Sequence, residues 1–512
     1  MPSSQVQAQA EQERRRRATR VSAYDQFKAR YWADPAGFVR DCIVWKGDDT
    51  LTDYQADSLC HLIQYKRLSV RGPHGLGKTG MAAWIVLWFA LTRDGKDWKI
   101  PTTASAWRQL TKFLWPEIHK WARRLRWDVI GRSPFNERTE LQTLGLKLLT
   151  GEAFAVASNR KELIEGAHAD HLLYLFDEAK AIPVDTFDAA EGAFSNAGSD
   201  TANEAYAVAI STPGEPQGRF YDIQRRKAGY EDWFVRVVTL EETITAGRVS
   251  REWADNRKRQ WGETSTVYQN RVLGNFAASD EDGIIPLAWI EAANERWHDW
   301  AEQGKPGTLT DLGVDPSGGG DKFIQAPRYR GPGVDAIDTL QALPKPADPT
   351  DTMVQAGYVV IGLRANPAAR GVIDGIGIGA GIAHRVREQG FVVDIFIASA
   401  GSDKRDRSGD IGFANRRAAA WWNLREMLDP SYNAILALPP DDELTGDLTA
   451  PHYRMLSGGK YLIESKDDIR VRIGRSTDKG DTVVQGCCLP EKLPPAPFAA
   501  AAGGQRTAFV RR

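Results

Sequence analysis

Residues 72–79 have the spacing of a phosphate-binding loop, G-x-x-x-x-G-K-T. The glycines of this loop are Gly72, Gly75 and Gly77. Glycines let backbone N–H groups turn toward phosphate oxygens, while Lys78 would supply a positive charge and Thr79 a hydroxyl ligand for Mg²⁺. A strand predicted at 68–70 precedes the loop, and an apolar helix predicted at 81–91 would direct its positive end at the anion. The sequence therefore predicts a site for ATP and Mg²⁺.

Two acids, Asp177 and Glu178, follow an apolar strand predicted at residues 172–176. Hydrolysis needs a second carboxylate beside the metal and a group that orients or deprotonates the attacking water. Asp177 at the end of a strand would complete the Mg²⁺ coordination, and Glu178 would reach the water. Together with the loop, this pair predicts ATP hydrolysis.

Other residues are candidates for nucleotide contacts, each with a structural alternative. Gln55 could bind an adenine edge through its amide, or it could cap a helix or lie on the surface. Ser211 and Thr212 end the next apolar strand, where a hydroxyl would sense the γ-phosphate or cap the strand end. Arg71 and Arg108 are candidates to stabilise transition-state charge, at their own nucleotide or at a neighbour's.

A second set of carboxylates lies in the C-terminal half, at Asp315, Asp374, Asp478 and Asp481. The pattern of residues 308–490 predicts the order β-β-β-α-β-α-β, in which the first and fourth strands are neighbours in a ribonuclease-H-like sheet. Asp315 and Asp374 end these two strands, so their carboxylates would converge. Asp481 on a late helix would complete a site for two divalent ions, Mg²⁺ or Mn²⁺.

A competing interpretation treats residues 375–380 as the dinucleotide fingerprint G-x-G-x-x-A. We disfavour it because no acid ends a following strand at the distance that a ribose requires.

The composition limits the classes of function. The 512 residues predict several domains, and 66 Lys and Arg against 67 Asp and Glu give no overall basic charge for nucleic acid. Any DNA contact must therefore be local. The four cysteines lack disulfide or zinc spacing, and the apolar runs are too short to span a membrane. We expect a soluble protein of a reducing compartment, with no secretion signal.

The predicted fold is α/β, a P-loop ATPase domain with a parallel sheet followed by a ribonuclease-H-like nuclease domain. The expected segments are a flexible leader at 1–23, the ATPase domain at 24–240, a helical connection at 241–307, the nuclease domain at 308–490 and a flexible tail at 491–512.

These motifs, in this order, resemble those of the large terminase subunit of tailed bacteriophages, the motor that packages viral DNA. The resemblance runs from about Tyr24 to Cys488 and includes Tyr54-Gln55 and residues 106–109 and 113–118. It implies phosphate and metal contacts for Lys78, Thr79 and Asp177, catalysis by Glu178, coupling by Ser211-Thr212, and nuclease ligands at Asp315, Asp374 and Asp481.

The resemblance also implies partners and a place of action. These are double-stranded DNA, a small terminase subunit and the portal protein of a procapsid, with a homo-oligomeric ring during packaging and possible monomers in solution. The expected location is the host cytoplasm and, transiently, the portal vertex. Two departures from the family pattern, Lys322 after Asp321 and Thr482 after Asp481, leave the choice between Asp478 and Asp481 open.

Two other functions fit the same residues. One is a helicase-like or repair ATPase whose C-terminal acidic cluster is inactive. The other is a nucleotide-gated assembly scaffold that only docks DNA to a capsid.

Overall fold

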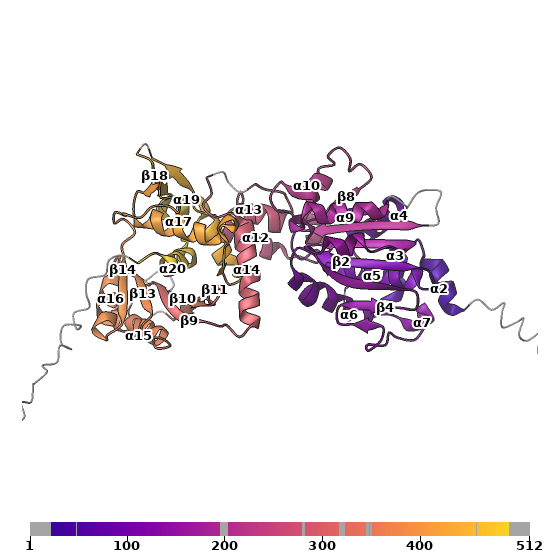
Figure 1. The fold of residues 1–512 in the computed structure, drawn as a ribbon, viewed down its shortest axis with the longest axis horizontal. Coiled ribbons are helices and arrows are strands. Elements are labelled where there is room, and N and C mark those ends of the chain that lie inside the picture. The colour runs from indigo at the N-terminus through magenta and orange to yellow at the C-terminus, as the bar shows by residue number, and fades with distance from the viewer. Residues whose placement is uncertain are drawn as a thin grey trace, which may run out of the picture. The chain divides into compact units, whose positions relative to one another are not determined.

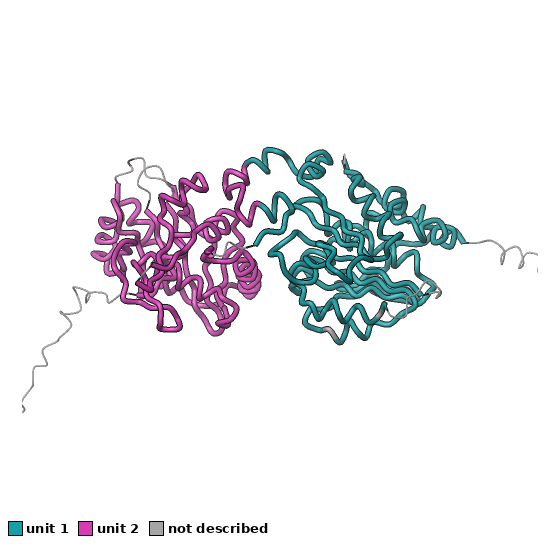
Figure 2. The backbone as a smooth tube through the Cα atoms, turned by 90° about the horizontal axis from the view of Figure 1, so that it is seen from above, with its two compact units in different colours: residues 1–255, 269–278 teal, residues 256–268, 279–512 magenta. Residues whose placement is uncertain are grey.

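The computed structural model describes residues 22–47, 49–194, 203–278, 282–316, 323–344, 348, 351–456 and 458–490. The leader and tail expected at the two ends lie outside these residues, except for Ser22 and Ala23. The chain forms two compact units, residues 1–255 with 269–278 and residues 256–268 with 279–512 (Figure 2). The connection expected at 241–307 is divided between the two units.

The first unit is built around a sheet with helices packed against it (Figure 1). Its eight described strands have the order β3-β4-β5-β2-β6-β7-β1-β8. The strands are β1 Arg67–Arg71, β2 Trp98–Ala104, β3 Leu141–Gln142, β4 Gly145–Lys147, β5 Gly151–Ala157, β6 His171–Asp177, β7 Glu204–Ser211 and β8 Phe234–Val237. The strands in the run β5-β2-β6-β7-β1-β8 pair in parallel, as predicted, whereas β3 and β4 form an antiparallel edge. The predicted parallel sheet is confirmed, and it carries an antiparallel edge because the short turn between β3 and β4 leaves no room for a crossover helix.

Helices cover both faces of this sheet. They are α2 Ala23–Tyr31, α3 Pro35–Cys42, α4 Asp53–Tyr65, α5 Lys78–Arg93, α6 Trp115–Ala122, α7 Trp127–Ile130, α8 Lys161–Glu165, α9 Val184–Phe194, α10 Gly218–Gln224 and α11 Leu240–Thr245, with α12 Arg251–Trp261 continuing into the second unit. Shorter turns are the π-helices Gln109–Leu114 and Gln269–Leu273 and the 3₁₀-helix Ala179–Ala181. Alternate residues of β6 enter opposite cores, Leu173 and Leu175 with α5 and Leu172 and Tyr174 with α9, as expected of a strand covered on both sides.

The second unit contains a larger sheet in the order β14-β13-β9-β10-β11-β16, with β12 on β10, and a small sheet β15-β18-β17. Its strands are β9 Thr308–Asp315, β10 Phe323–Gly331, β11 Val334–Ile337, β12 Gln341–Leu343, β13 Arg370–Asp374, β14 Val392–Phe396, β15 Gly412–Phe413, β16 Leu436–Ala437, β17 Tyr453–Met455 and β18 Lys460–Ile463. Strands β9, β10 and β11 are antiparallel, and β13 and β14 join β9 in parallel. This is the ribonuclease-H-like arrangement predicted from the sequence, and its antiparallel strands exclude the doubly wound dinucleotide fold.

The helices of the second unit are α13 Thr266–Tyr268, α14 Leu287–Glu302, α15 Thr352–Leu363, α16 Gly379–Glu388, α17 Arg416–Leu428, α18 Asp442–Thr449, α19 Lys466–Ile473 and α20 Asp478–Cys487, with a 3₁₀-turn at Pro430–Tyr432. Helices pack on both faces of the larger sheet. Val372 of β13 enters the core formed with α17 and α20, while its neighbour Ile373 enters the core formed with α15 and α16. None of the helices in the described parts of the chain has the length and apolar character needed to cross a bilayer.

Candidate active sites

The predicted phosphate loop lies between β1 and α5 in the first unit. Gly75 and Gly77 both have φ of +85°, a left-handed conformation that glycine adopts without strain. A Cβ atom on Gly77 would also lie 2.7 Å from the amide nitrogen of Gln55. The loop therefore needs glycine here both for its backbone turn and for space, and α5 begins directly after it at Lys78.

Lys78 is buried beside the loop, and its Nζ donates a hydrogen bond to the carbonyl of Pro73 at 3.1 Å. Burial lowers the pKa of Lys78, while the charges of Glu178 and Asp177 act in the opposite direction. The predicted lysine and acids thus belong to one electrostatic site. Thr79 follows Lys78 in the first turn of α5, half-buried.

The predicted acid pair stands at the end of β6. Asp177 is buried, and its pKa is raised to about 7 by burial and then by the neighbouring charge of Glu178. Glu178 has φ of +45°, which is rare for a residue with a side chain, and its N–H donates to the Asp177 carboxylate at 3.1 Å. Strained backbone of this kind concentrates at functional sites.

Strand β7 lies between β1, which leads into the loop, and β6, which carries the acids. Its last residue, Ser211, donates a hydrogen bond from Oγ to Glu178 Oε2 at 3.1 Å and accepts one from the backbone N–H of Lys180 at 3.3 Å. In register, Ser211 lies opposite Arg71 of β1. The hydroxyl therefore connects the candidate catalytic acid to the strand next to the loop, and Thr212 follows it, buried.

Two other residues predicted to contact nucleotide, Gln55 and Arg71, are hydrogen-bonded to protein groups. Gln55 is buried, accepts from the N–H of Thr52 at 3.2 Å and donates to the Leu76 carbonyl of the loop at 3.3 Å, so it ties the start of α4 to the loop. Arg71 donates to Gln224 at 3.1 Å and to the Gly274 carbonyl, which occupies its guanidinium with protein groups. Arg108 precedes the π-helix at Gln109–Leu114.

Asp315 and Asp374 lie side by side in the second unit, as predicted. Strands β9 and β13 are parallel neighbours with Val314 opposite Ile373, so each acid follows at the same level of its strand. Burial raises the pKa of Asp315 to about 7, with Lys466 acting against it and the other carboxylates of the cluster adding to it. Burial also raises the pKa of Asp374.

Helix α20 brings Asp478 and Asp481 to the same place because it packs directly on β9. A Cβ atom on Gly313 of β9 would lie 2.2 Å from the Thr482 carbonyl and 2.8 Å from the Gly486 nitrogen. Glycine at this strand position thus allows the close helix approach. The structure brings together all four acids predicted for the nuclease site, here called the acid cluster: Asp315, Asp374, Asp478 and Asp481.

A lysine that could not be predicted from the sequence, Lys466, stands within the acid cluster. The Nζ atom of Lys466, the first residue of α19, lies 3.3 Å from Asp481, 3.6 Å from Asp315 and 4.0 Å from Asp478. These carboxylates raise the pKa of Lys466 against the effect of its burial. No motif distinguishes this lysine, because it reaches the cluster only through the packing of α19.

Asp481 is the most strongly held acid of the cluster. It accepts hydrogen bonds from Arg417, from Trp421 at 3.3 Å and from Thr477 at 2.9 Å. Arg417 and then Lys466 lower the pKa of Asp481 despite its burial. Asp478 is more exposed and accepts from Ser476. Both acids contact Lys466, so the structure leaves both as candidate ligands.

The acid cluster has the donor chemistry of a divalent-ion site. Carboxylate oxygens suit Mg²⁺ and Mn²⁺, and the Lys466 ammonium already provides one positive charge among them. In the described residues, no three acidic, histidine or cysteine side chains are spaced to hold one ion as they stand. A cavity of about 710 Å³ opens beside the cluster and is lined by Asp374, Asp481, Arg417 and Lys466, among others. Asp321 and Lys322 lie outside the described residues.

No family model matches the chain. A relative described as a probable large terminase subunit of Enterobacteria phage P7 is 24% identical over 267 residues, which are 49% of this chain and 49% of the relative. The chain thus matches about half the length of this curated relative.

Two of the solved structures that match the chain come from other phages. The nuclease domain of the large terminase subunit of bacterial virus Sf6 is 20% identical, with a TM-score of 0.34, over 41% of this chain and 99% of that domain. The large terminase of a thermophilic bacteriophage is 13% identical, with a TM-score of 0.39, over 86% of this chain and 100% of that chain. The relative from phage P7 confirms the predicted resemblance: this chain is similar to the large terminase subunits of bacteriophages.

Proposed function

We propose that the chain is an ATP-driven translocase of double-stranded DNA joined to a metal-dependent endonuclease, which cuts concatemeric viral DNA and packages it into a procapsid. The observation that carries this proposal is the presence of two separate sites in one chain. One is a phosphate loop with an acid pair, and the other is an acid cluster on a ribonuclease-H-like sheet. The similarity to a large terminase subunit supports the same combination.

In the first unit, the loop N–H groups and Lys78 would hold the phosphates, and Thr79 and Asp177 would hold Mg²⁺. Glu178 would orient and deprotonate the attacking water. Since Ser211 at the end of β7 donates to Glu178, a change in the hydrogen bonding of this acid during hydrolysis would change a contact of β7. We propose this contact as the start of the coupling between hydrolysis and DNA movement.

In the second unit, a bound pair of divalent ions would stabilise the attacking and leaving oxygens of a phosphodiester. The acid cluster would hold those ions, and Arg417 would keep Asp481 ionised. A motor that moves along any sequence must hold phosphates rather than base edges, so DNA affinity should fall steeply with salt. The proposed partners are a small terminase subunit, the portal protein and further copies of this chain in a ring. The proposed place of action is the host cytoplasm and, transiently, the portal vertex.

Two substitutions test the two activities separately. Asp315→Ala should abolish Mn²⁺-dependent cleavage of plasmid DNA and retain ATP hydrolysis, while Glu178→Gln should do the opposite. Equal cleavage by wild type and Asp315→Ala would defeat the nuclease assignment and favour an ATPase with an inactive acidic cluster. Packaging of DNA into purified procapsids by Glu178→Gln would defeat the motor assignment and favour a scaffold.

A further inference from the structure

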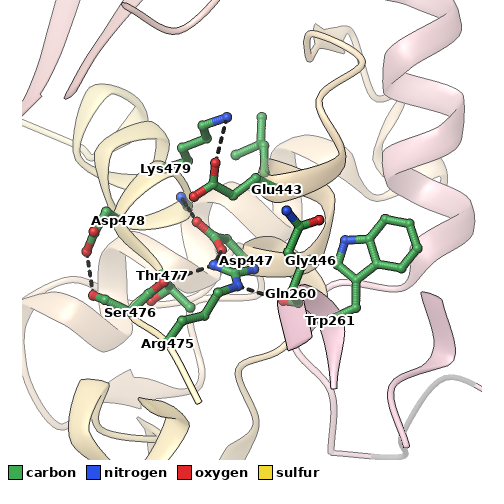
Figure 3. A network of polar contacts seen from close by, with 12 residues as sticks. Gln260, Trp261, Glu443, Gly446, Asp447, Arg475, Ser476, Thr477, Asp478 and Lys479 are labelled. Carbon is green, nitrogen blue, oxygen red and sulfur yellow. Dashed lines mark hydrogen bonds and ion pairs between the residues drawn. The ribbon is translucent and has the colours of Figure 1, made fainter. Parts of the chain in front are cut away.

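A buried polar joint connects α18 to the start of α20 in the second unit (Figure 3). At its centre is Asp447 of α18, whose side chain is fully buried. One carboxylate oxygen accepts from the Gly480 N–H at 3.0 Å, and the other pairs with the guanidinium of Arg475. Arg475 also donates to the Ser476 carbonyl at 2.9 Å and to the Gln260 carbonyl at 2.6 Å. The joint thus holds the backbone just before α20, at Ser476, and in its first turn, at Gly480.

The joint acts directly on the part of α20 that carries the acids. Gly480 lies between Asp478 and Asp481, and its N–H is one of the first-turn donors that a helix cannot satisfy internally. Asp447 satisfies this donor, and a negative charge near a helix N-terminus is electrostatically favourable. Because Asp447 itself is held by Arg475, the rotation of the first turn of α20 is fixed from outside the helix.

Two glycines give the joint its close packing. A Cβ atom on Gly480 would lie 2.8 Å from the Cβ of Asp447. A Cβ atom on Gly446 would lie 2.7 Å from the indole of Trp261 and 3.0 Å from the guanidinium of Arg475. Neither contact leaves space for a methyl group, so the side chains of Asp447, Trp261 and Arg475 pack directly on the glycine backbones of α18 and α20.

The 256–268 segment is the third member of the joint. Besides the Gln260 carbonyl that accepts from Arg475, the indole N–H of Trp261 donates to the Asp442 carbonyl at 2.9 Å. Lys479 of α20 pairs with Asp441, the residue that caps the N-terminus of α18, at 2.6 Å. The first turn of α20 is therefore held by two other stretches of chain, neither of which carries a predicted ligand.

We propose that Asp447 and Arg475 are positioning residues for the nuclease site, which set the place of Asp478 and Asp481 around the divalent ions. The inference rests on the proposed nuclease function. It adds two residues, and the segment that they bind, to a site whose sequence motifs contain neither. Groups that orient metal ligands from outside commonly change metal affinity about 10- to 100-fold when they are removed.

The test measures Mn²⁺ binding to the full chain by isothermal titration calorimetry, together with the Mn²⁺ dependence of plasmid cleavage. Asp447→Asn keeps an acceptor for the Gly480 N–H but removes the charge that holds Arg475, so we expect Mn²⁺ affinity to fall about tenfold. Asp447→Ala should cost more. The KM for DNA should stay unchanged, because the joint lies behind the acids rather than in the cavity.

The matched control is Asp335→Asn. Asp335 is also buried and accepts from Arg328 at 2.7 and 2.6 Å, but it lies on β11. The variant Asp335→Asn should lower the melting temperature, as Asp447→Asn should, and it should leave the Mn²⁺ affinity unchanged. Should Asp447→Asn fold poorly, Gly446→Ala perturbs the joint without removing a charge and should also weaken Mn²⁺ binding.

The outcomes separate the inference from the proposed function. A wild-type chain that binds Mn²⁺ and cleaves DNA, with the same Mn²⁺ affinity in Asp447→Asn, Gly446→Ala and Asp335→Asn, would overturn the positioning role alone. A wild-type chain that neither binds Mn²⁺ nor cleaves would overturn the nuclease assignment, and the positioning role with it.

Discussion

Divalent-ion binding at the acid cluster should depend on pH because a ligand must lose its proton first. Burial raises the pKa of Asp315 to about 7, with Lys466 opposing the shift and Asp478, Asp481 and Asp374 adding to it. About 0.9 of a proton is then bound to this carboxyl at pH 6 and about 0.1 at pH 8. Ion binding must release that proton. We therefore expect apparent Mn²⁺ affinity to fall about tenfold for each pH unit below 7.

The sign of the stability effect follows from the same shift. The folded pKa of Asp315 lies above the ordinary value of 3.8, so between about pH 4 and pH 7 the folded chain binds a proton that the unfolded chain releases. Without metal, this contribution to stability is present below pH 4 and is lost as the pH rises toward 7, at about 1.4 kcal/mol per unit. Added Mn²⁺ should reverse the trend, because it binds the ionised form.

The assay is calorimetric titration of Mn²⁺ at pH 6 and pH 8 in buffers of different ionisation enthalpy, which counts released protons. Asp177 of the first unit also has a pKa of about 7, so the titration uses an Asp177→Asn chain. Lys466→Met should raise the pKa of Asp315 further and increase proton release at pH 8. Lys305→Met is the matched control, because Lys305 pairs with Asp338 at 2.6 Å and not with the cluster. Equal proton release at both pH values would refute the reasoning.

Three further substitutions have expected outcomes. Lys466→Met removes the ammonium from the acid cluster and should tighten Mn²⁺ binding about tenfold once the pH is high enough to ionise Asp315 in the variant, as measured by calorimetry; weaker binding would show that the lysine is needed to hold the cluster together. Ser211→Ala removes the hydrogen bond to Glu178 and should lower kcat for ATP hydrolysis about tenfold with nucleotide affinity retained, as followed by phosphate release and fluorescent-nucleotide binding. Gly77→Ala combines a φ of +85° with a clash against Gln55 and should cost about 1–3 kcal/mol and abolish the rise in melting temperature on adding ATP; an unchanged rise would contradict the assigned loop geometry.

The first-unit site could be predicted because each of its motifs is a short continuous stretch of sequence. A glycine-rich loop between a strand and a helix determines its own conformation, and an apolar strand that ends in acids must place them at a sheet edge. The position of β7 between β1 and β6 could not be read from local pattern, since strand order depends on long-range pairing. The contact between Ser211 and Glu178 follows from that order.

In the second-unit site, too, some features could be predicted from local sequence and others depend on long-range packing. The convergence of Asp315 and Asp374 could be predicted, because parallel neighbouring strands end at one edge of a sheet. Lys466 and Arg417 gave no signal, because each is one cation among many on a helix. They meet Asp481 only because α17 and α19 pack around α20. Asp447 gave none either, because an acid in a short helix reads as a surface residue, yet it is fully buried.

One signal for the site was present in the sequence, at Gly313. A lone glycine within a buried strand is unfavourable unless another part of the chain comes close to its backbone. Here that part is α20, which also has a glycine, Gly486, at the contact. Without side chains between strand and helix, α20 lies near enough to β9 for Asp481 and Asp315 to share the ammonium of Lys466. The glycine therefore marks the approach of the last acid as clearly as the acids mark the site, and both are needed to place Asp315, Asp478 and Asp481 around one cation.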